Sequence, residues 1–148
     1  MARICEGAER HPDTRRSRHR NDDTFNRADE SIAMAAMYTA NHLSGVKAIV
    51  SLTESGDTPL WMSRIRSGLP IFALTRHPQT RHRMALCRGV EALAFDPTQY
   101  PYDEVNEAAI NLLKQNGRVH AGDLVLLTKG ARMGAHGQTN AMLILQVR

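Results

Sequence analysis

The feature that most constrains the fold is a regular alternation of helical and strand-like segments, which begins near residue 29 and continues to the end of the chain. Short apolar runs of strand length occupy residues 48–52, 71–74, 90–95, 124–128 and 141–147. Segments with helical periodicity occupy residues 29–43, 59–67, 79–87 and 103–116. Strands that alternate with helices are joined by crossover connections. The pattern therefore predicts a mostly parallel sheet covered by helices.

The last two apolar runs are joined by a glycine-rich stretch without a helical segment. A connection that lacks a crossover favours antiparallel pairing, so we expect the final strand to run against its neighbour. The fold class we predict is α/β, a three-layer α/β/α sandwich with about five strands. Residues 29–148 would form this domain. Residues 1–28 are less periodic, and we interpret them as the end of a helix followed by a polar connector.

Length and composition exclude several classes of protein. With 148 residues, of which 42% are hydrophobic, the chain can bury a core of ordinary size. No apolar run approaches the roughly 20 residues of a membrane span, and the charged N-terminus lacks the apolar stretch of a signal peptide. Cys5 and Cys87 have no partner at metal-ligand spacing. We expect both thiols to be buried and reduced, in a cytoplasmic protein without a membrane partner or a bound metal.

The positive charge of the chain is concentrated in one segment. The formal net charge is +4, and residues 10–20 hold five Arg and one Asp, so the rest of the chain is neutral. An arginine run can bind a phosphate backbone, and an Arg-rich nucleic-acid-binding α/β module is therefore the alternative function. Such runs more often form solvated linkers, and nucleic acid is not the partner we expect.

A polar loop between the first strand and the next helix is the most informative segment. It consists of Thr53, Glu54, Ser55, Gly56, Asp57 and Thr58. Backbone N–H groups at a helix N-terminus, together with hydroxyls, favour an anion, and Gly56 would let the chain curl around a phosphate. Thr58 is a plausible N-cap before Pro59 at the first helical position. The alternative is a simple helix cap with a flexible turn. The P-loop pattern is absent, and Glu54 and Asp57 oppose strongly charged ligands.

A second candidate loop is the glycine-rich segment 129–139. Its candidate ligand-binding residues are Gly130, Arg132, Gly134, His136 and Gly137. Ligands of open α/β sheets bind at the carboxyl ends of the strands, so both loops should meet at one edge of the sheet. Arg132 and His136 could donate hydrogen bonds to a phosphate. A mobile surface hairpin is the alternative.

The sequence offers no catalytic residues that we can name. His77, His82 and His120 stand in no recognisable nucleophile motif, and no carboxylate pair is placed for acid–base catalysis. A small stand-alone α/β enzyme would need an unrecognised active site. Turnover of a phosphorylated metabolite by this chain would favour that alternative.

Six stretches carry a family resemblance: MARICEGAER, DESIAMAAMYTANHL, AIVSLTESGDTPLWMSRIRSGLPIFALTRHPQT, CRGVEALAFD, GDLVLLTKG and GQTNAMLILQV. Together, and in this order, they resemble the C-terminal regulatory domain of pyruvate kinases, above all the bacterial isozymes activated by AMP and sugar monophosphates. The resemblance implies that catalysis, with Mg²⁺ and K⁺, belongs to a barrel domain that precedes this one. Residues 1–28 would then be a remnant of the last barrel helix and its linker. This chain would need no cofactor, and alone it would be inactive.

The resemblance also implies an effector site. The phosphate would bind the loop 53–58, and the segment 130–138 would close over the sugar. Members activated by fructose bisphosphate carry a basic residue at the position of Glu54 and an Arg at the position of Val105. We therefore expect a sugar monophosphate or AMP as effector. The resemblance further implies contact with the protein's own catalytic domain and a homo-oligomer, a dimer or tetramer, formed through this domain.

Overall fold

A computed structural model describes residues 2–15, 24–131 and 139–148 of the chain. Five strands form one sheet in these parts. They are β1 (Val46–Leu52), β2 (Ile71–Thr75), β3 (Val90–Ala94), β4 (Leu124–Gly130) and β5 (Thr139–Gln146). Their spatial order is β3-β2-β1-β4-β5, in which the first four strands are parallel and β5 is antiparallel to β4. The predicted sheet and its reversed last strand are confirmed.

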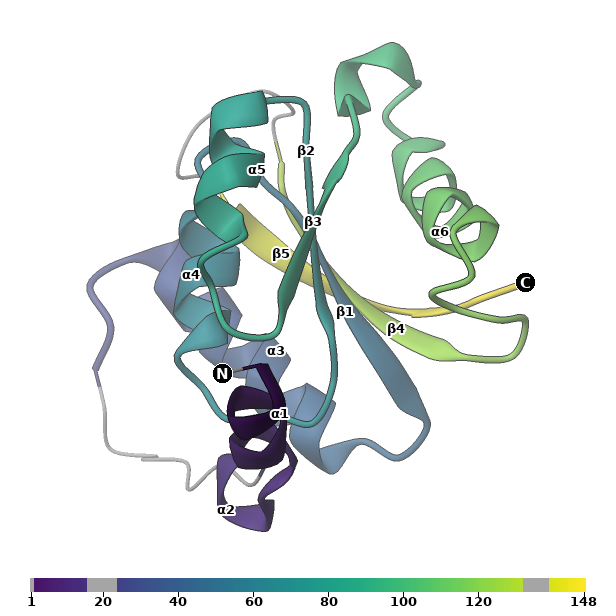
Figure 1. Ribbon diagram of the computed structural model, residues 1–148. Helices are drawn as coiled ribbons and strands as arrows, with labels where there is room; N and C mark the ends of the chain where they lie inside the picture. The colour runs from purple at the N-terminus through teal and green to yellow at the C-terminus, as the bar shows by residue number, and fades with distance from the viewer. Residues whose placement is uncertain (1, 16–23, 132–138) are drawn as a thin grey trace.

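Helices cover both faces of this sheet and complete the predicted three layers. They are α3 (Ala28–His42), α4 (Asp57–Ser63), α5 (Pro78–Met84) and α6 (Val105–Gln115). Figure 1 shows α3, α4 and α5 on one side of the sheet and α6 on the other. Each side encloses its own apolar core. The α/β/α sandwich therefore has two cores that share the central strands.

The residue pattern explains why these elements form. All five residues of β2 are buried, as a strand covered on both faces requires. In α3 the small side chains of Ala33, Ala36 and Ala40 are buried, so the helix can lie close to the sheet. Val105 and Leu113 lie on the buried side of α6 and pack in the core on the opposite face of the sheet.

The start of α4 differs from the expectation. The helix begins at Asp57 and ends at Ser63, with Gly56 rather than Thr58 as its N-cap residue. Gly56 has a left-handed conformation with φ of 85°, which only glycine adopts without strain. The chain therefore enters the helix earlier than Pro59, and the Thr58 side chain is buried instead of capping.

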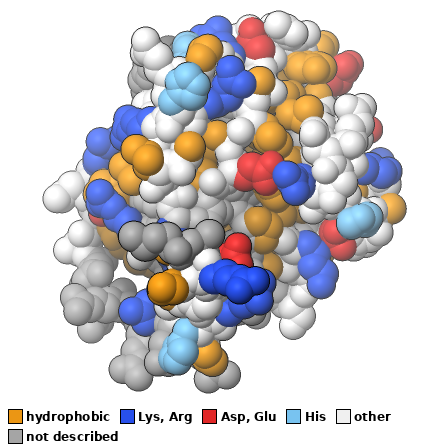
Figure 2. All heavy atoms as spheres, in the orientation of Figure 1, with side chains coloured by type: hydrophobic (Ala, Val, Ile, Leu, Met, Phe, Trp, Pro, Cys, Tyr) orange, Lys and Arg blue, Asp and Glu red, His pale blue; other side chains and the backbone are white. Residues whose placement is uncertain are grey.

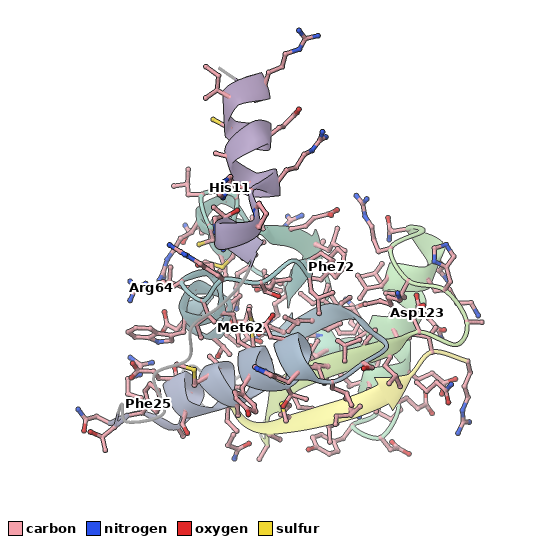
Figure 3. All side chains as sticks on the ribbon, turned by 90° about the horizontal axis from the view of Figure 1, so that it is seen from below. His11, Phe25, Met62, Arg64, Phe72 and Asp123 are labelled. Carbon is pink, nitrogen blue, oxygen red and sulfur yellow. The ribbon has the colours of Figure 1, made fainter. Side chains whose placement is uncertain are left out.

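The N-terminal part stands apart from the sandwich. Figure 3 shows α1 (Ala2–Arg10) projecting away from the sheet, followed by the short helix α2 (Pro12–Arg15). The predicted helix at the start of the chain is confirmed. Ile4 on α1 is 74% exposed. None of the helices in the described ranges is both long and apolar enough to cross a membrane.

The expectation of two buried thiols is wrong. Cys5 and Cys87 are free, but Cys5 is exposed and Cys87 is only partly buried. The reason is that Cys5 lies on the projecting helix α1, whose described side chains are exposed. Cys87 follows the end of α5, where the chain turns over the surface.

Candidate functional site

The carboxyl edge of the parallel strands brings together the two segments that the sequence singled out. The loop 53–58 follows β1, and Gly130 is the last residue of the neighbouring strand β4. The hydroxyl of Thr58 donates to the hydroxyl of Thr139, the first residue of β5, at 2.8 Å. Both residues are buried, at 2% and 7% exposure. The loop 53–58 and the described ends of the segment 129–139 therefore lie at one edge of the sheet, as predicted. Arg132, Gly134, His136 and Gly137 lie outside the described residues.

The loop 53–58 is fixed by its own hydroxyl groups. Thr53 Oγ1 accepts a hydrogen bond from the Gly56 amide at 2.8 Å, and Ser55 Oγ accepts one from the Asp57 amide at 3.3 Å. A hydroxyl that accepts keeps its own proton for another acceptor. Each of these two hydroxyls can therefore still donate to a ligand.

Helix α5 packs closely on this loop. A Cβ added at Gly56 would lie 2.7 Å from Cε of Met84. The Thr80 hydroxyl also donates to the backbone carbonyl of Glu54 at 2.8 Å. The loop is thus held from outside as well as from within.

The side chain of Glu54 is held by Arg76 and His77, which follow β2. Its Oε2 accepts a hydrogen bond from Arg76 Nε at 3.2 Å and also contacts Nε2 of His77. The carboxylate is almost buried between them. Glu54 is therefore turned toward these two residues, and its charge opposes an anion less than the sequence alone indicates.

The side chain of Asp57 is held by two arginines from different elements. Arg83 of α5 contacts Oδ1 at 3.2 Å, and Arg27, which precedes α3, contacts Oδ2 at 3.4 Å. Arg27 also pairs with the buried Asp29 through two bonds of 2.9 and 2.6 Å. These hydrogen bonds lower the pKa of Asp29 although burial opposes the shift.

Sequence reasoning missed all four of these basic partners, namely Arg27, Arg76, His77 and Arg83. They lie 22 to 30 positions from the loop carboxylates, those of Glu54 and Asp57, that they contact. The available signal was the basic run at residues 76–83, which directly follows a strand at the same edge of the sheet.

A cleft of about 740 Å³ opens between the loop and α5. Glu54 and Ser55 line it on one side, and residues 77–80 and Arg83 line it on the other. A larger cleft of about 890 Å³ lies beside α6 and the 3₁₀ helix η1 (Pro97–Gln99). Ser55 of the loop lines the smaller cleft and can donate its hydroxyl proton there, so this cleft is the candidate site for an anionic ligand.

The described residues form neither a cluster of metal ligands nor, on the face shown in Figure 2, a continuous basic patch. In the described parts of the chain, no three His, Cys, Asp or Glu side chains are grouped so that they could hold a metal ion. Figure 2 shows the Lys and Arg side chains on one face dispersed at several separate positions, with acidic side chains between them. Residues 16–20 of the arginine-rich segment 10–20, which hold three of its five arginines, lie outside the described residues.

The fold and its edge loops define an α/β sandwich domain with a cleft at the carboxyl ends of parallel strands. A family model described as the pyruvate kinase alpha/beta domain matches residues 30–145. Pyruvate kinase II of Salmonella typhimurium is 50% identical over 147 residues, which are 99% of this chain and 30% of that protein. A pyruvate kinase of Buchnera aphidicola is 49% identical over the same shares. One from Geobacillus stearothermophilus is 36% identical over 118 residues, 78% of this chain and 19% of that protein.

The chain therefore belongs to the pyruvate kinase family and corresponds to its C-terminal α/β domain. It spans about 30% of the length of the relatives that it matches most fully.

Proposed function

We propose that this chain is the effector-binding domain of a pyruvate kinase, an enzyme of glycolysis that converts phosphoenolpyruvate and ADP to pyruvate and ATP. The effector would be a sugar monophosphate or AMP, with its phosphate at the loop 53–58. The observation that carries this proposal is the loop itself, in which Thr53 and Ser55 accept from backbone amides and keep their protons for a ligand. The segment 130–138 would close over the sugar.

A single phosphate fits the charge of this site better than two. The carboxylates of Glu54 and Asp57 are already engaged by basic groups, so little positive charge remains for a second anion. Val105, which stands where bisphosphate-activated members carry an Arg, is fully buried in the core under α6. A second phosphate would find no donor at that position, and an unpaired phosphate is costly.

We further propose that the catalytic groups, with Mg²⁺ and K⁺, belong to the part of the relatives that this chain does not span. Residues 1–28 would be a linker and the end of a barrel helix, and the exposed Ile4 supports such a packing role. We also propose a dimer or tetramer formed through this domain. The edge strand β5 and its exposed Ile144 support this proposal.

Titration calorimetry of the 148-residue chain tests the effector proposal. We expect saturable binding of at least one of glucose 6-phosphate, ribose 5-phosphate and AMP. Fructose 1,6-bisphosphate should bind more weakly than the best monophosphate. If none of these compounds binds, or if fructose 1,6-bisphosphate binds tightest, the proposal fails.

A further inference from the structure

Arg83 reaches from α5 to the loop 53–58 and contacts it at two points. Nη1 donates to the backbone carbonyl of Ser55 at 3.2 Å, and Nη2 donates to Oδ1 of Asp57 at 3.2 Å. The side chain is 51% exposed and lines the cleft of about 740 Å³. One guanidinium thus braces the loop and forms part of the wall of the cleft.

The side chains that line this cleft have more N–H and O–H donors than their contacts with the loop engage. A guanidinium has five N–H groups, and the contacts with Ser55 and Asp57 engage two of them. The Ser55 hydroxyl, which lines the same cleft, accepts from the Asp57 amide and keeps its proton. The Thr80 hydroxyl, by contrast, already donates its proton to the Glu54 carbonyl. Arg83 and Ser55 are therefore two side chains of this lining that can donate to the same anion.

The loop itself supplies no positive side chain. Its two ionisable residues are Glu54 and Asp57, so an anion needs a cation from a neighbouring element. Arg76 and His77 face Glu54, which leaves Arg83 as the arginine that lines the cleft beside Ser55. Arg27 also holds Asp57, at 3.4 Å, and would keep that carboxylate paired if Arg83 turned toward a ligand.

On the basis of the proposed effector function, we propose that Arg83 determines the specificity of this cleft for a phosphate group. The guanidinium binds two phosphate oxygens through its planar fork, and the Ser55 hydroxyl donates to the same group. Asp57 competes with the phosphate for Arg83. Ligand affinity is then set by a balance between an internal carboxylate and an external phosphate.

Calorimetry on four variants of the full chain separates this role from simple bracing of the loop. Ribose 5-phosphate, glucose 6-phosphate and AMP serve as ligands, and inorganic phosphate probes the anion site alone. Arg83→Gln should weaken binding about tenfold or more, as expected for loss of a charged hydrogen bond. Arg83→Lys should recover part of that loss. Asp57→Asn should tighten binding several-fold, since it frees the guanidinium and removes a negative charge.

The matched control is Arg118→Gln, which removes an exposed ion pair with Glu91 of 2.7 Å elsewhere on the surface. It should leave the affinity unchanged, and thermal melting should show that each variant is folded. Equal affinities of the wild type and Arg83→Gln would overturn the role of Arg83 and leave the effector function standing. Weaker binding by Asp57→Asn would show that Arg83 only braces the loop, and it too would overturn the proposal. Failure of the wild type to bind every phosphorylated ligand would overturn both.

Discussion

The hydroxyl oxygens of Thr58 and Thr139 are 2.8 Å apart, although the two residues are separated by 81 positions in the sequence. Thr58 lies in the first turn of α4, and Thr139 begins β5. This buried bond joins the loop after β1 to the segment that precedes the last strand. It couples the two parts of the chain that we propose to hold the effector.

Loss of this bond should destabilise the domain. Thr58→Val removes one partner and leaves the hydroxyl of Thr139 buried without it, which costs about 1–3 kcal/mol of unfolding free energy. Urea denaturation measures the change. The double variant Thr58→Val/Thr139→Val should lose less than the sum of the two single variants. Strict additivity would show that the hydroxyls do not interact.

Gly56→Ala tests the close contact between the loop and α5. Alanine at this position would have to adopt the left-handed conformation of Gly56, which lowers the unfolding free energy by about 1–2 kcal/mol. It would also press on the fully buried Met84, which adds about 1–3 kcal/mol.

Gly89→Ala is the matched control for this substitution. Gly89 also has a positive φ, of 71°, but a Cβ there meets nothing within 4 Å. The excess loss of unfolding free energy in Gly56→Ala over Gly89→Ala therefore measures the contact with α5. Equal losses in the two variants would show that this contact contributes nothing.

The pair of Arg27 and Asp29 predicts a dependence of stability on pH. Hydrogen bonds from Arg27 lower the pKa of Asp29 in the folded protein, so the folded state favours the charged carboxylate. The stabilisation is complete above the unfolded pKa of about 4 and disappears as the pH falls through the lower folded value.

Unfolding free energies measured between neutral and acidic pH test this linkage. Asp29→Asn should destabilise the protein by about 1–2 kcal/mol at pH 7, and the difference from wild type should shrink at acidic pH. Asp103→Asn, which removes an exposed carboxylate, controls for the change in net charge. A difference between Asp29→Asn and wild type that stays constant with pH would contradict the assignment.

The chain alone should have no pyruvate kinase activity. Among the described residues, no acidic cluster is arranged to hold the metal ions that phosphoryl transfer requires. A coupled assay with phosphoenolpyruvate, ADP, Mg²⁺ and K⁺ measures this directly. Turnover that scales with chain concentration and survives repurification would refute the prediction.

The order of the elements could be predicted from the sequence because it depends on local periodicity. The alternation of apolar runs and amphipathic segments determines parallel pairing, and the connection without a helix reverses β5. The position of the loop 53–58 followed for the same reason. The start of α4 could not be predicted, because Thr58 before Pro59 is a typical capping pattern. Its hydroxyl is instead drawn into a tertiary contact with Thr139.

The pairing of charges around the candidate site, unlike the order of the elements, could not be predicted from the sequence. The sequence shows two carboxylates in the loop, Glu54 and Asp57, and therefore predicts that the loop opposes anions. It does not show their basic partners, because these are distant in the sequence. Arg27 and Arg83 reach Asp57 only once α3 and α5 are packed on the same side of the sheet. Side-chain pairing across elements depends on the assembled fold, and no local pattern contains that information.

Ser55→Asp tests the proposed phosphate site most directly. The Ser55 hydroxyl accepts from the Asp57 amide and lines the cleft, so its proton is available to a phosphate. An aspartate at this position removes that donor and places a third carboxylate beside Glu54 and Asp57. Effector affinity should fall by roughly 2 kcal/mol or more, because a charged hydrogen bond is lost and repulsion is added.

Calorimetry with ribose 5-phosphate, glucose 6-phosphate and AMP measures this loss. Ser44→Asp is the matched control, because it adds the same charge at an exposed position just before β1, at the opposite edge of the sheet. Ser55→Ala should weaken binding less than Ser55→Asp, since it removes the donor without adding repulsion. An affinity of Ser55→Asp equal to that of Ser44→Asp would place the phosphate somewhere other than the loop 53–58.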